Sequence, residues 1–260
     1  MQFKVLGPLE VVASGRTVTP QATKIRSLIA LLCVHSGTIL SRDYLVHAIW
    51  SDNPPHTART ALQVYVSKLR KTLDTHAGLA DRLITKPSGY LLELETGELD
   101  LREFDSLSRC ARIAADSGRL DEALRSLQAA CSLWRGRALA DLRGSPAFDS
   151  VARQLDERRI DVLERRIDVQ LSLRQHRSVI GELYGLIEEY PTWEAIHSQL
   201  MISLYRSGRV GESLKVYRKI RDSLVREIGM EPGAEIRRLH QSILARDPAL
   251  DMDLNLSIAG

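Results

Sequence analysis

The segment from Thr57 to Leu73 constrains the fold of this chain more than any other stretch, because its side chains separate into two faces at helical spacing. One narrow sector of such a helix is apolar and should pack against a core. Its members are Leu62, Val66, Leu69 and Leu73. No acidic residue interrupts the segment. We therefore predict an amphipathic helix that is buried along one side and has Thr57 as its N-cap.

The opposite face of this helix carries short polar and long basic side chains. Its members are Thr60, Val64, Ser67, Lys68 and Lys71, flanked by Arg59, Gln63 and Arg70. In a DNA major groove, Lys and Arg donate to guanine, Gln pairs with adenine, and an apolar side chain such as Val64 contacts a thymine methyl. The alternative is the solvated face that most surface helices have. The segment alone favours this alternative, so the surrounding chain has to decide.

The residues before this segment predict a small antiparallel sheet and a helix. Residues 1 to 19 alternate like short strands that are broken at Gly7-Pro8 and Ser14-Gly15. From Gln21 to His35, apolar residues recur on one helical face, and Gly37 ends the pattern. The chain therefore opens with strands followed by a first helix.

A second, shorter helix should begin at Ser41, which is a good N-cap, and end near Trp50. The side chains expected to face inward are Tyr44, Leu45, Ala48 and Ile49. Trp50 and Tyr90 could stack on bases, but aromatic residues at a helix end and in a strand are more often core. We expect both in the core.

After the Thr57 segment, the pattern predicts a β-hairpin. The runs from Leu83 to Thr85 and from Tyr90 to Leu94 alternate around the turn-forming tetrad Lys86-Pro87-Ser88-Gly89. A sheet, three helices and a hairpin that stands out as a wing make a winged helix-turn-helix, and the preceding sheet indicates the OmpR-like subtype. Residues 1 to 98 are thus predicted to form an α+β DNA-binding domain.

The distribution of charge agrees with this assignment. The formal net charge of the 260-residue chain is only +3, and residues 1 to 98 carry 11 Lys and Arg against 8 Asp and Glu. The remaining residues hold 25 of each sign, so all of the excess lies in the first third. A local basic patch on a nearly neutral chain fits a modest footprint on phosphate, with specificity coming from base contacts.

Several classes of function find no support in the sequence. Cys33, Cys110 and Cys131 are far apart, and the histidines lack metal-binding spacings, so no metal or cofactor is expected. The chain has no GxSxG, GxxxxGK[ST] or Gly-rich dinucleotide loop, and we do not expect an enzyme. It also has no basic leader region and no apolar run near ~18 residues, which predicts a cytoplasmic protein without a membrane segment.

From about Asp100 onward the chain is helical and repeats itself. The strings SGRLDEALRSL (Ser117 to Leu127) and SGRVGESLKVY (Ser207 to Tyr217) share residues at matching places, and Leu173 to Leu183 is a weaker copy. Helix pairs of about 34 residues with a glycine at the turn are the tetratricopeptide signature.

This pattern predicts an all-α, tetratricopeptide-like domain over residues 99 to 247. Gly118 and Gly208 should occupy the turns of its helix pairs. The last residues, from Pro248 to Gly260, show no period and are expected to form a flexible tail. Arrays of this kind usually bind proteins.

The order of motifs resembles one family closely. SRDYLVHAIW, then PP, then ARTALQVYVSKLRKTL, then PSGYLL is similar to the DNA-binding domain of the SARP family, the Streptomyces antibiotic regulatory proteins. The helical part, with its closing REIGMEPGAEIRRLHQSIL, resembles the bacterial transcriptional activation domain that follows the winged helix in that family. The resemblance extends from Phe3 to about Leu244.

The resemblance implies where DNA would bind. In winged helices of this subtype the third helix enters the major groove and the wing contacts the backbone or the minor groove. The residues that would face the groove are Thr60, Gln63, Val64, Ser67, Lys68 and Lys71, with Gln63 and Lys68 expected to contact bases. The residues expected to contact phosphates are Arg42, Arg59, Arg70, Lys86 and Ser88.

Two of these assignments have open alternatives. Arg59 and Arg70 could equally form an ion pair with a neighbour such as Asp52. Leu91 follows Gly89-Tyr90 where many OmpR-like wings carry Arg, which leaves insertion of this position into the minor groove in question.

The resemblance also implies a sequence-specific transcriptional activator of a secondary-metabolite gene cluster. Such a protein would bind double-stranded DNA at direct repeats near the promoter −35 region and recruit RNA polymerase holoenzyme, including its sigma factor. A second protomer would stand beside the first, about 10 to 10.5 bp away, because that spacing returns the groove to the same face. The alternatives are a protein-interaction adaptor that uses the tetratricopeptide-like domain, and a repressor on the same fold.

Overall fold

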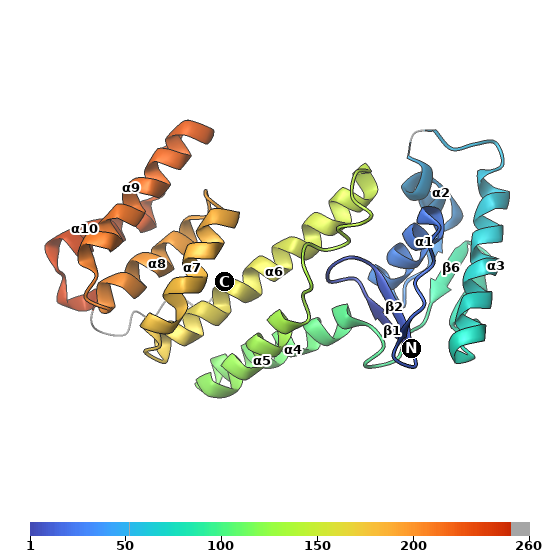
Figure 1. Cartoon of the computed structure of the whole chain (residues 1–260), viewed down its shortest axis with the longest axis horizontal. Helices are drawn as coiled ribbons and strands as arrows, with labels where there is room; N and C mark the ends of the chain where they lie inside the picture. Colours follow the sequence, from blue (N-terminus) through green and yellow to red (C-terminus); the bar gives the residue numbers. More distant parts are fainter. Residues whose placement is uncertain (52, 251–260) are drawn as a thin grey trace. The chain divides into compact units, whose positions relative to one another are not determined.

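The computed structural model describes residues 1–51 and 53–250, and the chain divides into two compact units (Figure 1). The first unit contains Met1–Arg109 and Ala129–Ile160, and the second contains Cys110–Gln128 and the residues from Asp161 onward. The first unit therefore continues past the division predicted after residue 98.

The N-terminal sheet has three short antiparallel strands within the described residues, in the order β1-β2-β3. Their bounds are β1 (Gln2–Lys4), β2 (Glu10–Ala13) and β3 (Arg16–Thr17). Phe3 lies opposite Val11, and both side chains are buried. The predicted alternation of buried and more exposed residues is confirmed for β1 and β2, whereas both residues of β3 are exposed, and all three strands are shorter than expected.

Three helices follow in the first unit, as predicted: α1 (Thr23–Val34), α2 (Arg42–Trp50) and α3 (Ala58–Ala77). The hydroxyl of Ser41 accepts a hydrogen bond from the Tyr44 amide at 3.1 Å, so the predicted cap of α2 is confirmed. The prediction that Tyr44 faces inward is wrong, because its side chain is exposed and its hydroxyl lies 3.5 Å from Nε2 of His35. Thr57 occupies the N-cap position of α3, but its side chain makes no capping bond.

The wing hairpin belongs to a second three-stranded sheet in the described chain, with the order β4-β6-β5. Its strands are β4 (Leu40–Ser41), β5 (Leu83–Lys86) and β6 (Gly89–Leu92), and η1 (Ala80–Arg82) leads into β5. The hairpin confirms the prediction from the Lys86 to Gly89 tetrad. The sequence did not reveal β4, because a two-residue strand has no alternating pattern.

Gly89 is required where β6 crosses β4. A Cβ added at this glycine would collide with the backbone carbonyl of Leu40 and would lie 2.9 Å from Cα of Ser41. Both of these neighbours are backbone atoms, which cannot rotate away. The absence of a side chain at Gly89 therefore allows the wing to pair with β4.

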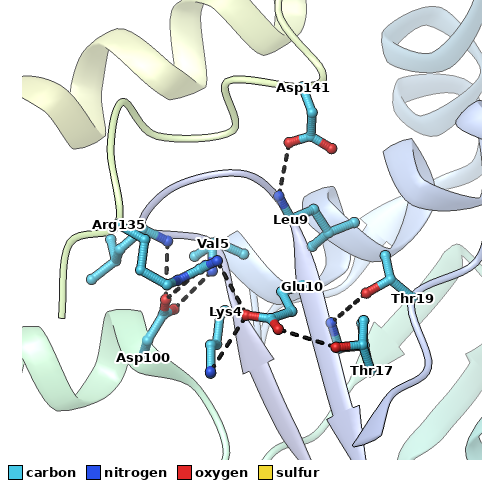
Figure 2. A network of polar contacts seen from close by, with 11 residues as sticks. Lys4, Val5, Leu9, Glu10, Thr17, Thr19, Asp100, Arg135 and Asp141 are labelled. Atoms are coloured by element: carbon cyan, nitrogen blue, oxygen red, sulfur yellow. Dashed lines mark hydrogen bonds and ion pairs between the residues drawn. The ribbon is translucent and has the colours of Figure 1, made fainter.

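Residues from beyond position 98 complete the first unit through a network of polar contacts around β1 and β2 (Figure 2). The carboxylate of Asp100 accepts hydrogen bonds from the amides of Val5 at 2.9 Å and Leu6 at 3.0 Å. Nη2 of Arg135 lies 3.9 Å from the same carboxylate, and Nη1 of Arg135 lies 3.3 Å from Oε2 of Glu10. These contacts fasten the end of β1 to residues that lie some 95 to 130 positions away in the sequence.

The loop before α6 (Pro146–Ser172) continues this network. Asp141 accepts a hydrogen bond from the Leu9 amide at 2.8 Å and forms an ion pair with Arg26 of α1. The amide of Arg135 donates to the Leu6 carbonyl at 2.9 Å. The N-terminal sheet thus depends for its hydrogen-bonding partners on segments that follow the winged helix in sequence.

Helices account for the rest of the described chain (Figure 1). Besides α6, they are α4 (Asp100–Asp116), α5 (Leu120–Ser132), α7 (His176–Glu189), α8 (Glu194–Arg206), α9 (Val210–Glu227) and α10 (Ala234–Ala245). Gly118 and Gly208 have φ values of 71° and 80° and lie in the turns of the α4–α5 and α8–α9 pairs. The predicted turn positions of the helical repeat are confirmed.

The predicted flexible tail is described only in part. Pro248–Leu250 forms a short 3-10 helix in which Leu250 is buried, and Nε of Arg206 donates to its carbonyl at 2.8 Å. The remainder of that tail, residues 251 to 260, lies outside the described residues. Across the described part of the chain, no helix is long and apolar enough to cross a membrane.

Candidate nucleic-acid interface

The apolar face of α3 is buried as the sequence predicts. The exposed fraction of each of its side chains is 1 or 2%, and they contact α1 and α2. These side chains are Leu62, Val66, Leu69 and Leu73. Their burial fixes the rotation of α3 about its own axis, and this rotation determines which residues face away from the core.

The opposite face of α3 is free. All six residues predicted to face a groove are exposed: Thr60, Gln63, Val64, Ser67, Lys68 and Lys71. Within residues 1–51 and 53–250, no hydrogen bond or ion pair engages the polar side chains among them. Val64 is 46% exposed, so its side chain is accessible on the same face. The structure therefore places the predicted set on one accessible helical face.

Arg59, one of the predicted phosphate contacts, forms an exposed ion pair with a neighbouring acid. Its Nη2 atom lies 2.7 Å from Oδ1 of Asp43 on α2, and both side chains are about three-quarters exposed. The alternative partner named from the sequence, Asp52, lies outside the described residues. Because the pair is exposed, it is worth at most about 1 kcal/mol and can open to meet a phosphate.

Arg42 and Arg70 differ from Arg59, because their guanidinium groups are bound to the wing. Arg42 donates to the carbonyls of Lys86 and Pro87, and Arg70 donates to the carbonyl of Leu83 and the hydroxyl of Thr85. Within the described residues Arg70 has no ion-pair partner, and Asp52, the neighbour named from the sequence, lies outside them. The partners of Arg70 are acceptors of the hairpin, which sequence spacing alone does not reveal.

The tip of the wing presents two of the predicted residues to solvent. Ser88 is exposed and Lys86 is half-buried, and neither side chain has a hydrogen bond or ion pair in the described structure. Leu91, the position that departs from the OmpR-like pattern, is only 8% exposed and belongs to the core. Insertion of Leu91 into a minor groove would require the wing to unfold.

The two aromatic residues expected in the core behave differently from each other. Tyr90 is 4% exposed, and the centroid of its ring lies 5.6 Å from Cζ of the Arg42 guanidinium above it. Trp50 is only partly buried and stacks on Tyr65 of α3, with ring centroids 5.8 Å apart. Trp50 thus packs against α3, whereas Tyr90 is a buried residue of the wing sheet. His56, in the loop before α3, is exposed.

Searched over residues 1–51 and 53–250, the structure has no cluster of His, Cys, Asp or Glu that could hold a metal ion. The interface consists of a helix face with basic and polar side chains and of an adjacent hairpin tip. Such a surface can form hydrogen bonds to base edges and phosphates.

Two family models match this chain. "Transcriptional regulatory protein, C terminal" matches residues 16–92, and "Bacterial transcriptional activator domain" matches residues 99–244. The regulatory protein DnrI of Streptomyces peucetius is 36% identical over 257 residues, which cover 96% of this chain and 94% of that protein. The chain belongs to the SARP family.

Longer members of the SARP family share only part of their length with this chain. The regulatory protein AfsR of Streptomyces coelicolor is 35% identical over 251 residues, covering 96% of this chain but 25% of AfsR. Family membership makes this protein a transcriptional activator with a DNA-binding winged helix followed by a bacterial transcriptional activator domain.

A solved structure shows the same fold. Mycobacterium tuberculosis EmbR, solved in complex with a low-affinity phosphopeptide, superposes with a TM-score of 0.90 at 31% sequence identity. The match covers 95% of this chain and 65% of the EmbR chain. The predicted arrangement of an OmpR-like winged helix with strands on both sides, followed by an all-α domain, is therefore confirmed.

Proposed function

We propose that this SARP-family protein activates a secondary-metabolite gene cluster by binding direct repeats near the −35 region of its promoters. One observation carries the proposal: α3 buries one face and leaves the opposite face, with Lys68 and Lys71 among its six members, exposed and without a side-chain hydrogen bond or ion pair to any described residue. A helix held in this way can enter a major groove without rearrangement. DnrI, which matches almost along its whole length, is a Streptomyces regulatory protein.

Gln63 and Lys68 are the residues proposed to contact bases. A Gln side chain forms paired hydrogen bonds with adenine, and a Lys ammonium donates to guanine. Both residues are exposed on α3, about 1.4 turns apart along the helix. Thr60, Val64, Ser67 and Lys71 surround them on the same face.

Two protomers would stand head to tail on the two repeats, about one helical turn of DNA apart. The helical domain would supply contacts between protomers and to RNA polymerase holoenzyme with its sigma factor. Tetratricopeptide-like arrays commonly provide such protein-binding surfaces.

A paired substitution tests whether α3 reads DNA. The full-length protein first selects DNA fragments from random and genomic pools, and the sequence element that these fragments share is used for binding measurements. Lys68→Ala with Lys71→Ala should weaken binding at least about 30-fold, since each contact of this kind is worth about 1 to 3 kcal/mol. The dependence of affinity on salt should also decrease, by up to about 0.9 for each phosphate contact that is lost.

Lys215→Ala with Lys219→Ala provides a matched control. These two lysines are exposed on α9 in the second unit, and the double substitution removes the same charge. The affinity of this control variant for the DNA element should stay within about twofold of the native value, because the substitution removes no groove contact. If the control weakens binding as strongly as the α3 variant, general charge rather than α3 determines binding and the proposal is wrong.

A further inference from the structure

The wing is attached to the helices of the first unit by two arginines that begin on different helices. Arg42, the first residue of α2, donates from Nη1 to the Pro87 carbonyl at 2.6 Å and from Nη2 to the Lys86 carbonyl at 3.2 Å. Its guanidinium also lies over the ring of Tyr90 in β6. A single side chain thus engages both sides of the hairpin tip.

Arg70 holds the other end of β5. Its Nε and Nη2 atoms donate to the Leu83 carbonyl at 3.0 and 2.7 Å, and Nη2 also donates to Oγ1 of Thr85 at 2.7 Å. Arg70 lies next to Lys71 on α3, so this attachment starts on the helix that carries the groove-facing residues. The distance between that helix and the wing is therefore set by a direct side-chain contact.

The geometry of these contacts argues against a direct role on phosphate. A guanidinium has five N–H donors in a fixed fork. Arg42 uses Nη1 and Nη2 on the hairpin, and Arg70 uses Nε and Nη2, so the hairpin contacts fix the direction of the remaining donors of each group. Turning either group toward DNA would break these bonds and leave hairpin carbonyls without a donor. Arg59, whose only described partner is the exposed Asp43, has no such cost.

We propose that Arg42 and Arg70 are positioning residues that hold the wing in register with the groove face of α3, so that the DNA affinity contributed by Lys86 and Ser88 depends on them. The proposal rests on the proposed function, since it concerns the same DNA interface. It replaces the phosphate-contact role expected for these two arginines from the sequence.

The physical effect has two parts. A hairpin fixed before binding loses little conformational freedom when its tip meets DNA, whereas a loose hairpin would have to be ordered at that moment. Arg42 also covers the carbonyl oxygens of Lys86 and Pro87, whose partial negative charges would otherwise face the phosphates. Lysine cannot replace arginine here, because an ammonium lacks the planar fork that spans two carbonyls.

A double-mutant cycle on the full-length protein tests the proposal with the selected DNA element as probe. Arg42→Ala is measured in the native background and in a background carrying Lys86→Ala and Ser88→Ala. Arg42→Ala should weaken binding about tenfold in the native background and less than about twofold in the second, because the residues it positions are already gone. Arg70→Lys should show the same dependence on background.

Arg59→Ala is the matched control, since it removes the same charge from an arginine that does not contact the wing. Its effect should be equal in the two backgrounds. If Arg42→Ala instead behaves like this control and lowers the salt slope by about 0.9 in both backgrounds, Arg42 contacts a phosphate directly and the proposal is overturned.

Hydrogen exchange on the free protein separates failure of this proposal from failure of the proposed function. Arg42→Ala, checked for an unchanged circular dichroism spectrum, should speed exchange of the amides in residues 83–92 by about tenfold and leave α3 unaffected. Arg42→Lys, the milder variant, should change the same amides in the same direction. Unchanged exchange in the wing refutes the positioning role even if the protein binds no DNA, whereas absence of DNA binding by the native protein refutes only the proposed function.

Discussion

Asp100 is the residue whose removal should reveal how far the DNA-binding unit extends. It is the first residue of α4, beyond the winged helix. Its carboxylate nevertheless accepts hydrogen bonds from the amides of Val5 and Leu6 at the end of β1 (Figure 2). Asp100 is only 9% exposed, and the two residues whose amides donate to it are fully buried. No other acceptor serves these two amides in the described structure.

The size of the effect follows from these contacts. Asp100→Ala leaves two buried N–H groups without an acceptor, and each such group costs about 1 to 3 kcal/mol. Burial raises the pKa of Asp100, which means that the native protein already bears a cost for its ionised form, and the substitution relieves that cost. We therefore expect a net loss of about 2 to 4 kcal/mol in the free energy of unfolding of the first unit.

Urea unfolding of the full-length protein, followed by Trp fluorescence and circular dichroism, measures this loss. Asp116→Ala provides the control, because Asp116 lies exposed on the same helix and its removal should change stability by less than about 0.5 kcal/mol. Equal unfolding midpoints for Asp100→Ala and the native protein would refute the reasoning. The Asp100 carboxylate would then contribute nothing to the stability of the N-terminal sheet.

Two further predictions concern single residues elsewhere. Gly89→Ala should force β6 away from the Leu40 carbonyl and lower the free energy of unfolding by about 2 to 4 kcal/mol, as measured by urea unfolding. The control is Gly181→Ala, because a Cβ added at Gly181 has no neighbour within 4 Å and the backbone there is not in the left-handed region. Burial raises the pKa of Asp168 to about 6 from its usual 3.8, despite a hydrogen bond from Gln199. The native state therefore holds this proton more tightly than the unfolded state, and the free energy of unfolding should fall by up to about 3 kcal/mol as the pH rises from 4 to 7. Asp168→Asn should flatten this pH dependence, and an unchanged profile would contradict the assigned burial.

The elements that carry a periodic pattern could be predicted from the sequence. The core face of α3, the cap at Ser41 and the turns at Gly118 and Gly208 follow from local spacing and residue type, and the structure confirms each. Such features depend on residues a few positions apart, which a single sequence displays directly.

Features that depend on distant residues could not be predicted in the same way. The partners of Arg42 and Arg70 lie 13 to 45 positions away, and those of Asp100 lie about 95 positions away. Arginines beside a predicted recognition helix look alike in sequence whether they contact a phosphate or a hairpin carbonyl. Tyr44 was misplaced for a related reason, because the helical pattern of α2 is too short to define the edge of its buried face.

The contributions of the two units to DNA binding can be separated only if the first unit remains intact. A fragment of residues 1 to 98 lacks Asp100, Arg135 and Asp141, which hydrogen-bond to or pair with its N-terminal sheet and α1. Poor binding by that fragment would therefore report loss of structure as well as loss of the helical domain. Substitutions in the full-length chain avoid this ambiguity.

Selection of DNA by the purified full-length protein, followed by footprinting on the selected fragments, tests the central claim most directly. We predict that the selected fragments share a short sequence element and that the protein protects two direct copies of it on one face of the duplex, about 10 to 10.5 bp apart. Lys68→Ala with Lys71→Ala should abolish this protection. Weak retention that disappears in modest salt, without a shared element among the fragments, would show that the exposed face of α3 does not read DNA.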